Sequence, residues 1–179
     1  FEKAKNQSWY NNTLFIITAD HTSAANKKPE YNNTVGQFKI PILFFEPANK
    51  ELKGINTKNI QQIDIYPSII DYLQLDAEFI SYGKSYKFEQ DFVINYANNS
   101  YNYYNGDYYL IFNGKESSGL YKFKEDLLLK NNLLVKEKEI KKQMESFIKA
   151  YIQSFNYRMN NNKLTIDKEL NLKNKIAKK

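Results

Sequence analysis

The 179-residue sequence contains no cysteine, and it has only one histidine, one tryptophan, four prolines and six glycines. Without cysteine the chain can form neither a disulfide nor a thiolate metal site. No apolar run approaches the ~18 residues that a membrane-spanning helix needs, and the polar residues at the start do not resemble a signal peptide. These absences exclude a disulfide-stapled scaffold.

Aromatic residues are abundant, with 15 Tyr and 12 Phe, and hydrophobic residues make up 42% of the chain. That share is enough for a hydrophobic core, and the length suits one domain or a piece of a larger one. Tyrosine fits half-buried strands, because its ring is apolar and its hydroxyl is polar. The composition is that of a globular chain.

The net charge of +6 is unevenly distributed. Residues 136–179 carry twelve basic against five acidic residues, which gives +7 for this segment and leaves the rest near neutral. A charge run of this kind is typical of a solvated helix face. Because the excess belongs to the tail and not to a groove, we expect no nucleic-acid partner.

The hydrophobic pattern predicts two buried strands, at 14–18 and 38–45, separated by a polar loop over 22–37. Pro41 is unfavourable in a central strand, because it cannot donate to a ladder. Apolar residues at helical spacing over 65–73 predict a helix with Pro67 in its first turn. Two strands are too few for a complete doubly wound sheet, so the sequence suggests a fragment.

The second half predicts an antiparallel meander followed by a long helix. Its strands are expected at 92–96, 101–104, 108–112 and 119–123, with turn signals at Asn105-Gly106 and Asn113-Gly114. An apolar stripe at helical spacing then predicts a helix that ends at the asparagines 160–162. The stripe consists of Ile140, Met144, Phe147, Ile148, Tyr151, Ile152 and Phe155. The fold class is therefore α/β.

The single histidine, His21, follows Asp20 directly after the first predicted strand. Open α/β sheets bind their ligands at this end of a strand, and a carboxylate with an imidazole suits Zn, Mn, Mg or Ca, depending on the other ligands. Neighbouring residues of an ideal strand point to opposite faces, so both reach one ion only if the chain turns after the strand. The alternative is an aspartate that caps the next helix beside a hydrogen-bonded histidine.

Three segments resemble a known family in the family's own order. They are the strand that ends in Asp20-His21 (residues 9–21), the proline-containing strand (39–47) and the helix with an Asp-x-x-Pro start (62–73). Together they resemble the sulfatase-like branch of the alkaline phosphatase superfamily over about residues 1–85. The nearest match is the lipoteichoic acid synthase and phosphoglycerol or phosphoethanolamine transferase group, because sulfatases proper usually have Asp-Asn here. Many relatives have glycine after Asp-His, where this chain has Thr22-Ser23.

The resemblance implies the carboxyl-terminal part of an alkaline-phosphatase-like α/β/α sandwich. Residues 1–86 would belong to the catalytic domain, 87–160 would form a subdomain of meander and amphipathic helix, and 161–179 would be a polar basic tail. Asp20 and His21 would bind one divalent metal, with Mn or Zn favoured and Mg or Ca possible. The threonine nucleophile and an acidic ligand would precede Phe1, so we expect no catalytic residue in this chain and no turnover by it alone.

The resemblance also implies the kind of substrate and its location. The partner would be an anionic lipid or glycan that bears phosphate or sulfate, and the rest of the same polypeptide would lie upstream. The enzyme would act at the extracytoplasmic face of a membrane to which it is anchored. Candidate substrate-binding residues are Lys28, Tyr31, Asn33 and Lys84, each of which could equally be a plain surface residue.

Several alternatives stay open. Asp64 is either a third metal-binding carboxylate or a helix-start residue favoured by the helix dipole. The tyrosines of the meander either bind sugars, as in a non-catalytic carbohydrate-binding or interaction domain, or pack across strands. The chain could also come from a sulfatase proper, or from a relative that has lost its metal. The tyrosines concerned are Tyr96, Tyr101, Tyr103, Tyr104, Tyr108 and Tyr109.

Overall fold

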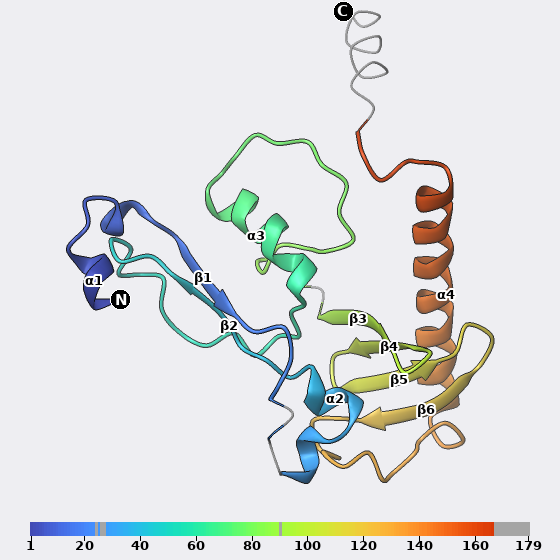
Figure 1. Cartoon of the computed structure of the whole chain (residues 1–179). Coiled ribbons are helices and arrows are strands. Elements are labelled where there is room, and N and C mark those ends of the chain that lie inside the picture. The colour runs from blue at the N-terminus through green and yellow to red at the C-terminus, as the bar shows by residue number, and fades with distance from the viewer. Residues whose placement is uncertain (24, 26–27, 90, 167–179) are drawn as a thin grey trace, which may run out of the picture. The chain divides into compact units, whose positions relative to one another are not determined.

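The computed structural model describes residues 1–23, 25, 28–89 and 91–166 (Figure 1). They divide into two compact units, each described here by itself. The first unit holds Phe1–Thr57 and Phe123–Lys130, and the second holds Lys58–Lys122 with Asn131 and the residues that follow. The domain boundary predicted at residue 86 falls inside the second unit. The predicted tail beyond residue 166 lies outside the described residues.

The first unit is built on a two-stranded antiparallel sheet. Phe15 of β1 pairs with Phe45 of β2, and Thr18 pairs with Ile42. Both strands were predicted, but β2 begins only after Pro41, whose missing N–H cannot join the ladder. The elements of this unit are α1 (Glu2–Lys5), η1 (Tyr10–Asn12), β1 (Phe15–Thr18), η2 (Pro29–Tyr31), α2 (Thr34–Gln37) and β2 (Ile42–Phe45).

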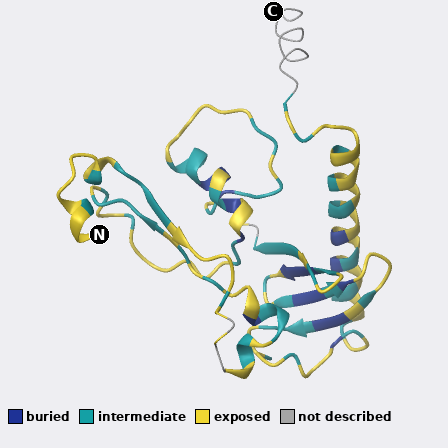
Figure 2. Ribbon diagram, in the orientation of Figure 1, coloured by how far each residue is buried: buried dark blue, intermediate teal, exposed yellow. Residues whose placement is uncertain are grey.

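Two expectations about this unit were wrong. The strands are not buried, since Ile17 is 43% and Leu43 is 52% exposed, and Figure 2 shows β1 and β2 without dark blue. Aromatic rings cluster on Phe15 and Phe45 at one end of this face, which leaves Ile17 and Leu43 uncovered further along it. The expected loop over 22–37 also contains two short helices, η2 and α2. Pro29 stands at the start of η2, and the Asn33 side chain caps α2.

The second unit confirms the predicted meander and helices. Its four strands pair antiparallel in the order β3-β4-β5-β6. Gly106 and Gly114, in the two predicted turns, have φ values of +57° and +99°, which glycine adopts without the cost that a Cβ would add. The elements are η3 (Gln62–Asp64), α3 (Ile65–Tyr72), β3 (Phe92–Ala97), β4 (Ser100–Asn105), β5 (Tyr108–Phe112), β6 (Ser117–Lys122) and α4 (Lys138–Asn160).

The core of the second unit lies between α4 and the meander. Met144 and Ile148 of the predicted stripe are buried, and Ile148 has no exposed surface. They pack against residues of β4, β5 and β6, and Phe147 stacks on Tyr103 with ring centroids 5.1 Å apart. Figure 2 shows dark blue along the strands and on the part of α4 beside them, and again at α3. Burial of this stripe stabilises α4, because most helix stability in proteins comes from packing of the apolar face and not from intrinsic helix propensity.

Candidate functional site

The side chains of Asp20 and His21 lie together just beyond the end of β1. His21 Nε2 is 3.4 Å from Asp20 Oδ2, and the side chains are 58% and 84% exposed, respectively. Asp20 Oδ1 accepts a hydrogen bond from the His21 main-chain N–H at 2.8 Å, so Oδ2 is the oxygen that faces the ring. The chain has turned after the strand, and two adjacent residues can therefore face one ligand.

The other ring nitrogen of His21 makes a hydrogen bond to the main chain. His21 Nδ1 lies 2.8 Å from the carbonyl oxygen of Thr22. A carbonyl oxygen only accepts hydrogen bonds, so in this arrangement Nδ1 is the donor. A neutral ring bonded in this way would present the lone pair of Nε2 to a metal ion.

Hydrogen bonds join the loop that carries Asp20 and His21 to the residue before β2 and to the last residue of α2. The Thr18 hydroxyl donates to the carbonyl of Pro41 at 2.9 Å, just before β2. The main-chain N–H of Thr22 donates to the carbonyl of Gln37, the last residue of α2, at 2.9 Å, and its hydroxyl donates to the same oxygen at 3.2 Å. The position of His21 therefore depends on α2.

Asp20 and His21 could supply two metal ligands, which is fewer than a complete metal site needs. No group of three or more histidine, aspartate or glutamate side chains gathers anywhere in the described part of the chain. A metal ion in a protein is usually held by three or four protein ligands. Any metal at this pair therefore needs ligands that the described residues do not supply.

The three candidate substrate residues of the loop lie in the same unit as the pair. Lys28 is exposed at the start of η2, and Tyr31 is half-buried within it. Asn33 is used by the fold, because its side chain accepts from the N–H of Gly36 at 3.0 Å and donates to the carbonyl of Leu127 at 2.8 Å. Substrate binding by Lys28 and Tyr31 stays a prediction.

Lys84 and Asp64 form a buried ion pair in the second unit. Lys84 Nζ is 3.1 Å from Asp64 Oδ2, with side chains 11% and 1% exposed, respectively, and it also donates to the carbonyl of Phe92 at 2.9 Å. The Asp64 carboxylate accepts from the main-chain N–H groups of Lys84 and Gln61. Asp64 therefore completes a capping box at the start of η3, the turn that leads directly into α3, in line with the helix-start alternative, and the Lys84 ammonium is held inside the fold.

Residues 83–87, here called the clamp segment, follow α3 closely. The Ser68 hydroxyl accepts from the N–H of Tyr86 at 3.0 Å. Asp71 accepts from the Ser85 hydroxyl and from Lys87 Nζ. The hydrogen bond from Ser85, followed by that from Lys87, holds the pKa of Asp71 below its ordinary value. These bonds have no local sequence signature, because their partners are 14 to 18 residues apart.

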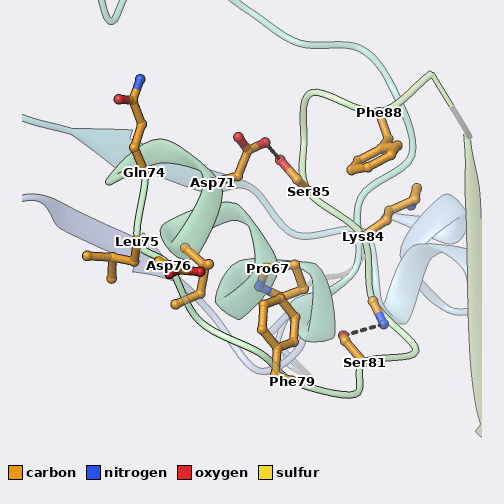
Figure 3. Close-up of a pocket in the computed structure, with 12 residues that line it drawn as sticks. Pro67, Asp71, Gln74, Leu75, Asp76, Phe79, Ser81, Lys84, Ser85 and Phe88 are labelled. Atoms are coloured by element: carbon orange, nitrogen blue, oxygen red, sulfur yellow. Dashed lines mark hydrogen bonds between the residues drawn. The ribbon is translucent and has the colours of Figure 1, made fainter. Parts of the chain in front are cut away.

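A pocket of about 690 Å³ opens beside α3 and the clamp segment. Figure 3 shows its walls, with Asp71 and Pro67 on α3, Phe79 on the loop that follows, and Ser85 and Phe88 at the other side. Its lining mixes apolar rings with carboxylates, but the carboxylate of Asp71 is already bonded to Ser85 and Lys87. Of the candidate residues from the sequence, Lys84 lines this pocket.

Three of the six candidate tyrosines of the meander pack inside the fold, whereas Tyr96 is exposed. Tyr103, Tyr104 and Tyr109 are 2%, 6% and 0% exposed. Tyr104 and Tyr109 are opposite each other in the ladder and stack with centroids 4.6 Å apart. Burial raises the pKa of Tyr103 to about 12. Cross-strand packing is therefore the role of these three rings, and they offer no flat exposed row for a sugar.

Comparison with known proteins places the fold. Neither a protein-family profile nor a curated protein sequence matches the chain. Solved structures do match it, among them a protein in the alkaline phosphatase superfamily from Vibrio parahaemolyticus, with 22% identity and a TM-score of 0.67. This match covers 93% of the chain and 40% of the Vibrio protein.

Two further solved structures also match most of this chain at low sequence identity. A sulfatase-like protein from Bacteroides thetaiotaomicron has 17% identity, a TM-score of 0.58, and coverage of 89% of this chain and 40% of its own. Ps i-CgsB, in complex with a neocarrahexaose, has 15% identity, a TM-score of 0.60, and coverage of 84% and 38%. The chain thus spans about 40% of the length of the structures it matches. Its fold is that of the carboxyl-terminal part of alkaline-phosphatase-like sulfatase folds.

Among the described residues, no helix combines the length and the apolar character that crossing a membrane requires.

Proposed function

We propose that the chain carries part of the metal site of a phosphotransferase or hydrolase of the sulfatase-like type, with Asp20 and His21 as two of the ligands. The observation that carries the proposal is the pairing of Nε2 and Oδ2, 3.4 Å apart and exposed, at the end of a strand. The likeness of the fold to sulfatase-like structures supports it.

The donor set fits a divalent metal. His21 offers the lone pair of Nε2 and Asp20 offers Oδ2, and the hydrogen bonds to the other side of each group hold both in place. Two ligands about 2.0–2.1 Å from one tetrahedral ion lie about 3.3–3.4 Å apart, which is close to the separation of these atoms. An imidazole nitrogen beside a carboxylate favours Zn or Mn, with Mg or Ca as the alternatives.

A bound metal at this site would lower the pKa of a nucleophilic hydroxyl and offset negative charge on the group under attack. The residues of this chain would hold and orient that ion, and Lys28 and Tyr31 would contact the substrate from η2. The nucleophile and the remaining ligands would come from other residues of the same polypeptide.

The proposed substrates are anionic lipids or glycans, with transfer of phosphoglycerol- or phosphoethanolamine-type groups. The protein would act at the extracytoplasmic face of a membrane to which another part of it is anchored. The Asp-His pair favours this activity, since Asp-Asn is usual in sulfatases proper. Sulfate-ester hydrolysis is the second candidate, because one of the matching structures is sulfatase-like.

Hydrolysis of a phosphodiester and of a sulfate ester by the full-length protein tests the proposal. Bis(p-nitrophenyl) phosphate and p-nitrophenyl sulfate are suitable probes, and we expect turnover of the phosphodiester that stops on chelation. Removal of a residue that merely supports a metal ligand costs about 10–100-fold in affinity or activity. Asp20→Ala and His21→Ala should therefore each lose at least about 100-fold.

Glu51→Ala removes an exposed carboxylate of the same unit and is the matched control. It should retain the activity of the parent protein. Preferential turnover of the sulfate ester would favour the second candidate. Full activity in Asp20→Ala or in His21→Ala would contradict the assignment of the residue that was replaced.

A further inference from the structure

The pocket beside α3 lies wholly within the second unit. All of its lining residues fall between Pro67 and Phe88, inside the Lys58–Lys122 segment of that unit, so it is a feature of one compact unit. Its volume of about 690 Å³ is in the usual range of small-molecule sites in proteins, about 300–1,000 Å³. The pocket is therefore large enough for a ring with a short side chain.

Hydrogen bonds hold two walls of the pocket in place without a ligand. One wall is α3 and the other is the clamp segment. The Ser68 hydroxyl accepts from the N–H of Tyr86 at 3.0 Å, and Asp71 accepts from Lys87 Nζ at 2.9 Å. Binding to walls that are already ordered costs little conformational entropy.

Three large apolar side chains line the pocket, and two of them are left in water. Phe88 is 61% and Leu75 is 50% exposed, and Phe79 lines the pocket with them. Figure 3 shows Phe79 on the loop after α3 and Phe88 just beyond the clamp segment. Apolar side chains that gather at the surface around a hollow are typical of a binding site.

The charges around the pocket leave one carboxylate unbalanced. Lys84 is paired with Asp64, and Lys87 is paired with Asp71. Asp76 also lines the pocket and is exposed, and no basic side chain of the described residues forms an ion pair with it. The pocket therefore combines aromatic rings with one negative charge that the fold does not neutralise.

We propose that this pocket binds an organic ammonium ion with an apolar body of about one aromatic ring. Aromatic rings attract a cation above their faces, and the Asp76 carboxylate complements its charge. An anionic ligand would be repelled by Asp76, because the ammonium groups of Lys84 and Lys87 already have carboxylate partners. The inference concerns the second unit alone and does not depend on the metal site of the proposed function.

Ligand-observed NMR of the full-length protein tests the inference with three probes of similar size. At neutral pH, 2-phenylethylamine is the cation, 2-phenylethanol is the neutral compound and phenylacetate is the anion. We expect the cation to bind about fivefold more tightly than either of the others, in line with one exposed cation–π contact and one exposed charge pair. Binding of 2-phenylethanol or phenylacetate as tight as that of the cation would overturn the inference.

Variants at exposed positions assign the binding to this pocket. Asp76→Asn removes the charge and keeps the shape, so it should weaken binding of the cation about two- to fivefold and leave that of 2-phenylethanol unchanged. Phe88→Leu removes a ring face and should weaken binding of the cation about threefold. Glu116→Gln and Tyr96→Leu change an exposed carboxylate and an exposed ring outside the pocket, and both should bind the cation as the parent protein does.

The variants can contradict the inference in two ways. Unchanged binding of the cation in Asp76→Asn or in Phe88→Leu would show that the ligand does not use these groups. An equal loss for 2-phenylethanol and the cation in Asp76→Asn would show that the charge is not what the pocket recognises. Either result leaves the assignment of Asp20 and His21 untouched, and a failure of metal binding by that pair leaves the pocket untouched.

Discussion

Replacing Asp64 with alanine should destabilise the second unit by about 3–5 kcal/mol, the usual cost of leaving one charge of a buried pair without its partner. The Lys84 side chain, which is 11% exposed in the parent protein, would lose its carboxylate partner and keep the hydrogen bond to the carbonyl of Phe92. The N–H groups of Gln61 and Lys84 would also lose their acceptor. Urea unfolding followed by circular dichroism measures the effect.

Two comparisons make this prediction specific. Asp76→Ala removes an exposed aspartate from the loop after α3 and should change stability by less than about 0.5 kcal/mol. Asp64→Leu combined with Lys84→Met removes both charges and should recover part of the loss, since apolar replacement of a buried pair is often neutral. Equal stability of Asp64→Ala and the parent protein would show that the pair does not hold α3 to the clamp segment.

Replacing Gly83 with alanine should cost about 3 kcal/mol, at the upper end of what an overpacked site usually costs. A Cβ at this position would lie 2.1 Å from the carbonyl oxygen of Ile63 and 2.9 Å from the nitrogen of Asp64. Both atoms belong to the backbone of η3, which the capping box holds in place. The clamp segment would have to move away from α3.

Amide hydrogen exchange shows whether the loss arises at this contact. The N–H groups of Lys84 and Tyr86 donate to Asp64 and Ser68, so both should exchange faster in Gly83→Ala. The N–H of Leu110 in β5 should change little, because it lies in the core of the meander. Unchanged exchange at Lys84 and Tyr86 would contradict the proposed close packing of Gly83.

Elements with a local signature could be predicted from the sequence. The two asparagine-glycine turns predicted two of the three hairpins of the meander, and the apolar stripe with Met144 and Ile148 predicted α4 and the face that it buries. These signals work because turn chemistry and helical periodicity depend on neighbouring residues. The same local reasoning placed Asp20 and His21 immediately after the first strand.

Features that depend on distant partners could not be predicted. The role of Lys84 depends on Asp64, 20 residues away, and that of Asn33 depends partly on Leu127, 94 residues away. A basic turn and a polar loop residue look the same in sequence whether they face a substrate or the fold. The exposure of Ile17 and Leu43 likewise depends on what covers their face, which a strand pattern does not contain.

The metal content of the full-length protein tests the central claim most directly. Protein stripped with a chelator, reloaded with Zn or Mn and desalted should retain one equivalent of metal by mass spectrometry. His21→Ala and Asp20→Ala should retain at least about tenfold less, while Glu51→Ala should retain the full equivalent. Retention of the full equivalent by both His21→Ala and Asp20→Ala would show that these residues do not bind the metal.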